Sequence, residues 1–191
     1  MRSLNIRNWK SNKSIQLIFK ILEKDDEETR FIGGCVRDLI AKRKKKYDVD
    51  IATTLKPKKV IELLKKKKIK IIKTGLSHGT VIAIINKEKF EITTLRKDIQ
   101  TDGRHAKVEF TNDWLEDSKR RDFTMNAMSC DIKGNLYDYH GGVKDLKKGV
   151  IKFIGEPKKR IKEDFLRILR FFRFYANYGK KKNWKFTNKY I

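Results

Sequence analysis

The sequence predicts an α+β fold, in which a mixed sheet with flanking helices is followed by the start of a helical unit. Strand-like runs such as TVIAII (80–85) and KFEITTL (89–95) share one stretch of chain with helix-like runs. From Pro157 onward the pattern changes, because apolar residues recur at helical spacing through 161–175. A chain of 191 residues with 39% apolar residues is long enough for a packed domain with an appendage.

The first half of the chain alternates between the two kinds of element. Residues 1–13 are polar and are expected to form a flexible terminus, and Pro57 suits the first turn of a helix. The predicted elements, in order, are a helix at 14–23, a strand at 30–34, a helix at 35–43, a strand at 47–52 and a helix at 57–68.

The second half adds most of the sheet. Residues 86–89 can close a hairpin, and the polar segment 97–113 lacks periodicity, so it is expected to be a mobile loop. The predicted elements are strands at 69–74, 80–85 and 89–95, a helix at 118–127, strands at 128–132, 136–139 and 150–154, and a long helix at 161–175.

The charge balance indicates a polyanionic partner. Lys and Arg number 48 against 24 acidic residues, a formal charge of +24, which favours RNA or DNA, although lysine runs can also form a solvated face. Cys35 and Cys130 provide no disulfide framework, and the three histidines lack metal-ligand spacing. With no leader peptide and no long apolar run, the chain is expected to be cytoplasmic, without a membrane partner.

Two aspartates in the predicted strand at 47–52 form a candidate metal site. Asp48 and Asp50 are two residues apart, so on a strand both carboxylates face the same way, roughly 7 Å apart. Paired carboxylates suit a hard divalent cation, and Mg²⁺ fits best. Glu91, on a strand that could neighbour this one, is the candidate third carboxylate. Taken singly, these residues also fit an exposed edge strand and a solvated side chain.

A glycine pair precedes these aspartates. Gly33 and Gly34 lie at a predicted strand-to-helix turn, where the backbone can approach a phosphate and the helix offers free N–H groups. Arg37 follows about one turn into the helix and can reach the same anion. A glycine pair alone is weak evidence, whereas the pair followed by Arg37 and D-x-D is far more specific.

Four segments together resemble one family. GGCVRD (33–38) with DVDIAT (48–53) resembles the first signature of class II CCA-adding tRNA nucleotidyltransferases and their bacterial poly(A) polymerase relatives. RRDFTMNA (120–127) resembles the second signature, GGVKDL (141–146) the third and EDFLRILRFFRF (163–174) the fourth. The resemblance spans about 14–180 and departs at Phe165, where the family usually has proline.

The resemblance implies a polymerase-β-like nucleotidyltransferase head over 14–155, followed by a nucleotide-selecting helical neck over 156–191, with the body and tail of the family absent. It implies that Asp48 and Asp50 hold the metal ions, that Glu91 is the third acidic residue, and that 97–113 is a flexible loop acting as a lever. The nucleotide-binding residues that it implies, or that the glycine turn suggests, are Gly33, Gly34, Arg37, Arg121, Asp122, Asn126, Asp164, Arg167, Arg170 and Arg173.

The C-terminal helix carries a repeating charged stripe. Asp164, Arg167, Arg170 and Arg173 recur every three residues and predict one slanted flank, opposite a packed side of Phe165, Ile168, Leu169 and Phe172. Cytosine and adenine both present an amino donor beside a bare ring nitrogen, whereas uracil and guanine present the reverse. A carboxylate with an arginine would therefore accept C and A and reject U and G. Asp164 and Arg167 match the family positions with that role; a plain surface stripe is the alternative.

The predicted activity is template-independent addition of C and A to the 3′ end of tRNA, from CTP and ATP, with release of pyrophosphate. Poly(A) synthesis and partial CC- or A-addition share these motifs and stay open, as does a non-catalytic RNA-binding remnant. A second chain supplying body and tail is a further possible partner.

Overall fold

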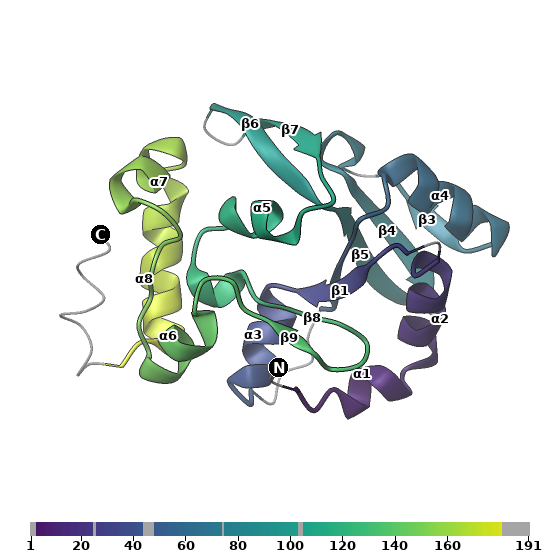
Figure 1. The fold of residues 1–191 in the computed structure, drawn as a ribbon, viewed down its shortest axis with the longest axis horizontal. Coiled ribbons are helices and arrows are strands. Elements are labelled where there is room, and N and C mark those ends of the chain that lie inside the picture. Colours follow the sequence, from purple (N-terminus) through teal and green to yellow (C-terminus); the bar gives the residue numbers. More distant parts are fainter. Residues whose placement is uncertain (1–2, 25, 44–47, 74, 103–104, 181–191) are drawn as a thin grey trace.

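The structure is a computed structural model that describes residues 3–24, 26–43, 48–73, 75–102 and 105–180. Its main sheet has seven strands in the order β3-β4-β5-β2-β1-β8-β9 (Figure 1). The strands of this sheet are β1 (Thr29–Ile32), β2 (Asp50–Thr53), β3 (Lys70–Ile72), β4 (Thr80–Ile85), β5 (Glu88–Thr94), β8 (Ser129–Cys130) and β9 (Leu136–Tyr137).

The sheet is mixed, as predicted. Strands β2 and β5 run parallel, and the other neighbouring pairs are antiparallel. Asn86 and Lys87, both with positive φ, join β4 to β5, which is the backbone geometry of a tight two-residue hairpin turn. The flanking helices of this part are α1 (Arg7–Ser11), α2 (Lys13–Leu22), α3 (Gly34–Ile40), α4 (Pro57–Lys66), α5 (Trp114–Lys119) and α6 (Gly142–Lys148), with short 3₁₀ turns η1 (Leu76–His78) and η2 (Thr124–Asn126).

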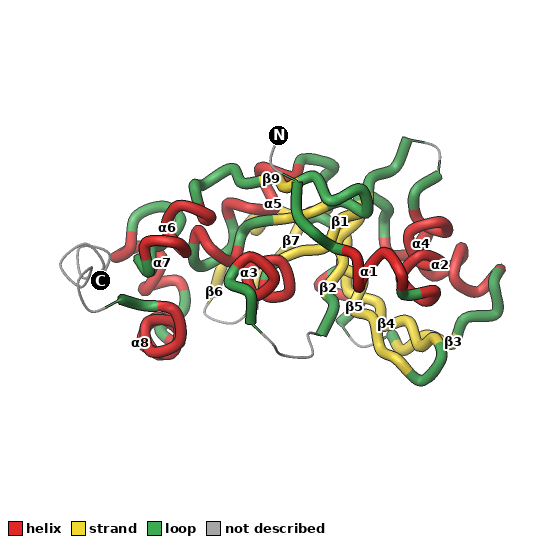
Figure 2. Tube along the Cα trace, turned by 90° about the horizontal axis from the view of Figure 1, so that it is seen from below, coloured by secondary structure: helices red, strands yellow, loops and turns green. Residues whose placement is uncertain are grey.

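Alternation along the central strands divides the core between two faces of the sheet. Phe31 and Ile51 belong to the main core, to which α2 and α4 contribute. Their neighbours Ile32 and Ala52 belong to a smaller cluster with Leu95 and Trp114 on the opposite face. Figure 2 shows α2 and α4 at one end of the molecule and α6, α7 and α8 at the other, with α3 between them.

The N-terminal segment is not the flexible polar extension that was expected. Its described part contains α1, and Ile6 and Trp9 are buried in the main core, with the Trp9 ring 4.4 Å from that of Phe31. The Asn12 side chain accepts hydrogen bonds from the backbone N–H groups of Ser14 and Ile15 and so caps α2. Two apolar residues in a short polar stretch gave too weak a periodic signal to predict this.

The expected mobile loop at 97–113 is instead mostly a two-stranded antiparallel ribbon, β6 (Arg96–Asp102) with β7 (His105–Phe110). This ribbon projects from the main sheet (Figure 1). Its sequence lacks apolar alternation because it does not cover the main core, so its pairing rests on backbone hydrogen bonds. Residues 103 and 104, at its tip, lie outside the described residues.

Three other boundaries were predicted wrongly. The expected helix at 118–127 is replaced by α5, which begins at Trp114 behind an Asp113 cap, and by η2. The expected strand at 150–154 is a single bridge between Phe123 and Phe153. The strand expected at 47–52 begins only at Asp50, and residues 44–47 are outside the description.

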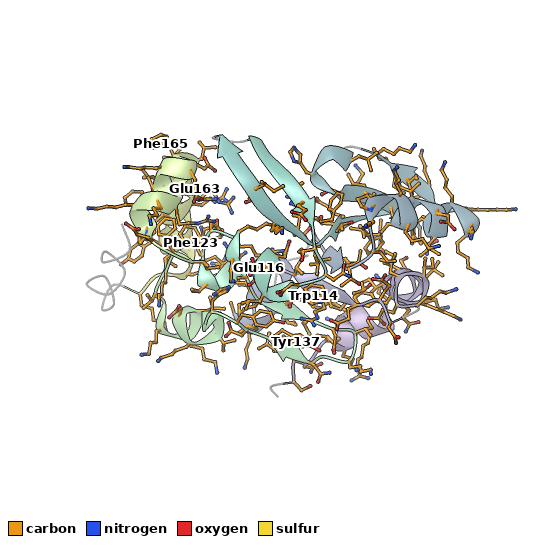
Figure 3. The ribbon with its side chains drawn as sticks, turned by 45° about the horizontal axis from the view of Figure 1, so that its top comes forward. Trp114, Glu116, Phe123, Tyr137, Glu163 and Phe165 are labelled. Carbon is orange, nitrogen blue, oxygen red and sulfur yellow. The ribbon has the colours of Figure 1, made fainter. Side chains whose placement is uncertain are left out.

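The C-terminal unit is broken where a single helix was expected. Helix α7 (Pro157–Glu163) ends before Asp164, whose backbone is extended, and α8 (Leu166–Tyr178) follows. Phe171 and Phe174 form the buried face of α8. The predicted packed side was wrong: Phe165, Leu169 and Phe172 are 70%, 67% and 50% exposed. Helix α8 packs on the head through the rings of Phe171 and Phe174, which contact Phe123. Figure 3 shows Phe165 at the outer edge of this unit.

None of the helices in the described part is long and apolar enough to cross a membrane.

A close backbone approach at the Gly141–Gly142 pair yields a stability prediction. A Cβ atom on Gly142 would lie 2.3 Å from the backbone oxygen of Thr124, so Gly142→Ala must push α6 away from η2. We expect this change to lower the free energy of unfolding by about 1–3 kcal/mol, measured by urea denaturation. Gly141→Asn is the matched control, because Gly141 has a φ of 74° that asparagine tolerates and no atom within 4 Å of its added Cβ. An equal loss in both variants would contradict the crowding argument.

Candidate functional site

A cleft of about 1030 Å³ lies between the sheet and the C-terminal helices. It is lined by every predicted site residue except Asp48 and Glu91. These lining residues are Gly33, Gly34, Arg37, Asp50, Arg121, Asp122, Asn126, Asp164, Arg167, Arg170 and Arg173. The size suits a ligand as large as a nucleotide, and residues more than a hundred positions apart in the chain meet in it.

Asp50 and Glu91 lie side by side on one face of the sheet. They are direct partners in the parallel pairing of β2 with β5, so their side chains project from the same face, with the strands roughly 4.8 Å apart. Burial raises the pKa of Asp50 to about 6; the Glu91 and Asp48 charges raise it too, while Arg121 opposes them. The predicted neighbourhood of Glu91 is therefore observed, although Glu91 itself is exposed beside the cleft.

Asp48 is placed differently from the expectation. It precedes β2, so the strand alternation that would put it on the Asp50 face does not extend to it. It is exposed and lines a neighbouring groove, together with Val49, Glu88 and Phe90. It remains near enough for its charge to raise the pKa of Asp50.

The donor chemistry of these acids fits a hard cation. Asp50 carries a raised pKa because it is buried next to like charges, and a divalent cation with oxygen ligands would relieve that repulsion. Across the described residues, however, no group of three or more Asp, Glu, His or Cys side chains is gathered into a ready-made metal cage. Of the three candidate acids, Asp50 and Glu91 share one face of the sheet and Asp48 lines the neighbouring groove, so an ion here would need substrate phosphates and water to complete its coordination.

The glycine turn lies against the side chain of Arg121. Gly33 has a φ of 67° and a ψ of −124°, a conformation that side chains disfavour. A Cβ atom there would lie 3.4 Å from Nη1 of Arg121. The turn and the arginine of RRDFTMNA therefore meet at the cleft, as expected from the order of the motifs.

A chain of hydrogen bonds joins the head to helix α8. Asp122, which is 8% exposed, accepts a hydrogen bond from Nε of Arg170 at 2.7 Å, and Nη2 of Arg170 lies 2.6 Å from the same oxygen in an ion pair. The other oxygen of Asp122 accepts from the Asn126 amide at 3.0 Å. Asn126 in turn accepts from Nη1 of Arg37 at 2.6 Å. These four predicted residues thus orient one another, and Arg170 links the two units.

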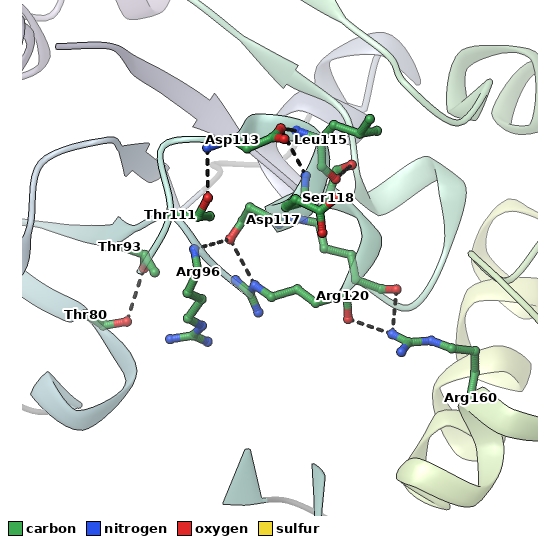
Figure 4. Close-up of polar contacts among 12 residues, drawn as sticks. Thr80, Thr93, Arg96, Thr111, Asp113, Leu115, Asp117, Ser118, Arg120 and Arg160 are labelled. Atoms are coloured by element: carbon green, nitrogen blue, oxygen red, sulfur yellow. Dashed lines mark hydrogen bonds and ion pairs between the residues drawn. The ribbon is translucent and has the colours of Figure 1, made fainter. Parts of the chain in front are cut away.

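Asp117 is an important residue that the sequence reasoning missed. It is 3% exposed and accepts from Nε of Arg120 at 2.9 Å and from Nη2 of Arg121 at 3.0 Å (Figure 4 shows the Arg120 contact). Burial by itself raises its pKa, but the Arg121 and Arg120 charges outweigh burial and hold the pKa low. Asp117 is spaced i, i+3 from Arg120 and i, i+4 from Arg121, which on a helix indicates ion pairs. This signal was not used because the helix was predicted to begin at 118.

Asp164 and Arg167 lie together at the break between α7 and α8. Asp164 Oδ1 accepts from the Leu166 N–H at 3.0 Å, and Nη1 of Arg167 donates to Glu163 and to the Arg160 carbonyl, both at 2.6 Å. Within the described part of the chain, Nε and Nη2 of Arg167 have no hydrogen-bond partner, so they are available to a ligand. Glu163 is thus a positioning residue that the stripe argument overlooked.

The β6–β7 ribbon also reaches the cleft. Arg96, Asp98 and Val108 line it, as does His78 of η1. Asp98 and Val108 come from the segment predicted to be a mobile loop, and Arg96 and His78 lie outside the predicted strands, so nothing in the periodicity assigned these residues to the site.

Comparisons with known proteins agree with this architecture. Residues 29–152 match the family model described as the poly A polymerase head domain. CCA tRNA nucleotidyltransferase 1, mitochondrial, of Danio rerio is 48% identical over 158 residues, which cover 82% of this chain and 36% of that protein.

Two solved structures have the same fold. The Bacillus stearothermophilus CCA-adding enzyme in complex with CTP aligns with a TM-score of 0.72 and 36% identity, over 83% of this chain and 38% of that one. A tRNA nucleotidyltransferase complexed with a primer tRNA and an incoming ATP analog aligns with a TM-score of 0.69 and 30% identity, over 91% and 49%.

The described fold is thus the polymerase-β-like head that the motifs implied. The chain spans less than half the length of each of these relatives. Since the family model matches well over half of the chain, the chain belongs to the family of the poly A polymerase head domain.

Proposed function

We propose that this chain is a template-independent nucleotidyltransferase that adds C and A to the 3′ end of tRNA from CTP and ATP, releasing pyrophosphate. One observation carries the proposal: the half-buried Asp50 of β2 and the Asp164–Arg167 pair of the C-terminal helices line one nucleotide-sized cleft. One related structure is a complex with CTP and the other a complex with a primer tRNA and an incoming ATP analog, which supports the choice of substrates.

For the metal, we propose Mg²⁺, held by Asp50 and Asp48 with Glu91 beside them. When bound, such an ion supplies charge stabilisation at the phosphoryl oxygens and eases deprotonation of the attacking hydroxyl. Asp50 must be ionised for this role, so protonation of its carboxyl, whose pKa is raised to about 6, would compete with the ion as the pH falls. Nucleotidyltransferases generally depend on a metal ion, and the choice of Mg²⁺ among such ions is our proposal.

The arginines of the cleft position the triphosphate in this proposal. Arg121 lies beside the Gly33 turn, where the backbone of Gly33 and Gly34 can approach phosphate oxygens. Arg37, Asn126 and Asp122 hold the nucleotide site in shape through their mutual hydrogen bonds. Such prearranged donors contribute by orientation and electrostatics rather than by covalent chemistry.

Base selection is assigned to Asp164 and Arg167. The free Oδ2 of Asp164 would accept from the amino group of C or A, and Nε or Nη2 of Arg167 would donate to the ring nitrogen. Uracil and guanine would place an N–H against the arginine and a carbonyl against the carboxylate. Arg170 and Arg173 complete this wall of the cleft.

The domain assignment is likewise a proposal: a catalytic head over 14–155 and a nucleotide-selecting neck over 156–191. The proposal includes a second chain as a partner that supplies body and tail functions. The cytoplasmic location stays a prediction, because the Danio rerio relative bears "mitochondrial" in its name.

A single assay tests the proposal. The purified chain is incubated with Mg²⁺, labelled CTP or ATP, and tRNA lacking its CCA end, and the product lengths are measured. Extension by three nucleotides, dependent on both CTP and ATP, is the expected result. Long A-tails would assign poly(A) synthesis, and extension by two C residues or one A would assign a partial activity. Retained RNA binding without any product would reject catalysis and leave an RNA-binding remnant.

A further inference from the structure

Arg96, the first residue of β6, lines the cleft with an unpaired guanidinium group. Its backbone N–H donates to Oδ1 of Asp117 at 3.2 Å. Its Nε and Nη1 atoms, in contrast, are buried and have no hydrogen-bond partner among the residues that the structure describes. Figure 4 shows the side chain extending away from Asp117, with no contact drawn to its guanidinium. A buried charged donor left unpaired is uncommon and requires an explanation.

The surroundings of Arg96 contain an excess of positive charge. Asp117 already pairs with the Arg120 and Arg121 side chains and accepts only the backbone N–H of Arg96, so its charge is shared before the Arg96 guanidinium can use it. Burial and the Arg120 charge lower the pKa of Arg96 to about 10; Asp117 and Asp98 raise it only in part, and Arg121 lowers it further. Keeping the Arg96 side chain charged therefore costs free energy in the ligand-free protein, and an anion bound in the cleft would remove this cost.

A purely structural role does not account for this arrangement. Arg30 is the structural counterexample in the same protein: it is 5% exposed, pairs with Glu28 at 2.5 Å and stacks over the rings of Trp114 and Tyr137 at 4.0 and 3.5 Å. A buried arginine that serves the fold is satisfied in this way. Arg96 has neither an ion-pair contact of this kind nor an aromatic partner in the described part of the chain.

We propose that Arg96 binds a phosphate group of the substrates, a role that rests on the proposed function and adds a residue to it. The planar fork of arginine N–H groups matches phosphate oxygens. The phosphate belongs either to the nucleoside triphosphate or to the backbone of the RNA end. Both anions enter this cleft in the proposed reaction, and both would neutralise the cluster of Arg96, Arg120 and Arg121.

The test measures binding in the full chain rather than turnover. Dissociation constants are determined at 150 mM salt for tripolyphosphate, for CTP and for an RNA hairpin ending in CC, with wild type, Arg96→Gln and Arg96→Lys. We expect Arg96→Gln to weaken at least one of the three by tenfold or more, and Arg96→Lys to bind with intermediate affinity because it keeps the charge but loses the fork. Lys97→Gln is the matched control: it removes the same charge from the next residue, which pairs with Glu109 on the exposed ribbon, and should stay within twofold of wild type.

The pattern of losses identifies the phosphate. Weaker tripolyphosphate and CTP binding assigns Arg96 to the triphosphate, and weaker RNA binding alone assigns it to the RNA backbone. Unchanged affinities for all three probes would overturn the proposal. So would losses of equal size in Arg96→Gln and Lys97→Gln, which would reflect net charge only.

Thermal melting of the ligand-free variants separates binding from folding. The unpaired charge of Arg96 destabilises the ligand-free fold, so Arg96→Gln should melt at the same temperature as wild type or higher. Tripolyphosphate should raise the melting temperature of Arg96→Gln less than that of wild type. A fall in melting temperature with unchanged dissociation constants would make Arg96 structural and refute the proposal. These readouts do not need catalysis, so an inactive chain that still binds phosphate through Arg96 would refute the proposed function alone.

Discussion

Asp50→Asn is expected to lower the rate of nucleotide transfer by about 10³-fold or more, while the protein stays folded. The variant keeps the volume of the side chain but removes the charge that would hold the cation beside the substrate phosphates. The measurement is single-turnover incorporation of labelled CTP into tRNA lacking its CCA end, at saturating Mg²⁺. Glu62→Gln is the control, because Glu62 is an exposed acid on α4 that pairs only with Lys59 and Lys66 among the described residues, and it should leave the rate unchanged.

The same variant is expected to be more stable than wild type when no divalent cation is present. The pKa of Asp50 is raised from 3.8 to about 6 by burial and by neighbouring carboxylates, so its charged form disfavours the native state. This penalty is fully present above pH 6 and is relieved as the pH falls through 6 toward 4. Removing the charge should therefore raise the free energy of unfolding at pH 7.5 by up to about 3 kcal/mol.

Denaturant unfolding of both proteins between pH 4 and 8, in EDTA, measures this effect. The gap between Asp50→Asn and wild type should narrow at low pH, where the wild-type carboxyl becomes protonated. Near-wild-type transfer by Asp50→Asn would remove the basis of the metal site. A variant that is both inactive and less stable at pH 7.5 would instead assign Asp50 to the fold.

Arg167→Ala is expected to blur the choice of nucleotide, with the ratio of C and A to U and G incorporation falling about 10–100-fold. Loss of the guanidinium removes the donor to the ring nitrogen of C or A and the repulsion toward the ring N–H of U or G. Glu163 loses one partner but keeps its bond from Arg160 at 2.5 Å, so the break between α7 and α8 should persist. Competition among the four labelled nucleotides measures the ratio directly.

Lys159→Ala provides the matched control for the helical unit. Lys159 is an exposed cation of α7 whose Nζ lies 3.1 Å from Glu156, outside the cleft, and its removal should leave the ratio as in wild type. Unchanged selectivity in Arg167→Ala would contradict base recognition by the Asp164–Arg167 pair. Lost activity toward all four nucleotides, with the ratio preserved, would indicate a role in binding rather than in selection.

The sequence by itself determined the family, the α+β class and most of the helices and strands of the head. These features depend on local signals: the alternation of TVIAII, the apolar face of α2, and four motifs whose residues are close neighbours in the chain. The strand prediction and the family resemblance also made Glu91 the candidate third carboxylate, and the pairing of β2 with β5 places it directly beside Asp50.

Only the tertiary structure decided how the charges of the site are shared. The pairing of Asp122 with Arg170 joins residues 48 positions apart, and the unpaired state of Arg96 depends on Arg120 and Arg121 having already occupied Asp117. Helix α8 packs through Phe171 and Phe174 and leaves Phe165 and Leu169 exposed, which the apolar pattern of the segment did not predict. Periodicity reports which side of an element is apolar, whereas the partner of a buried charge is set by competition among groups that only folding brings together.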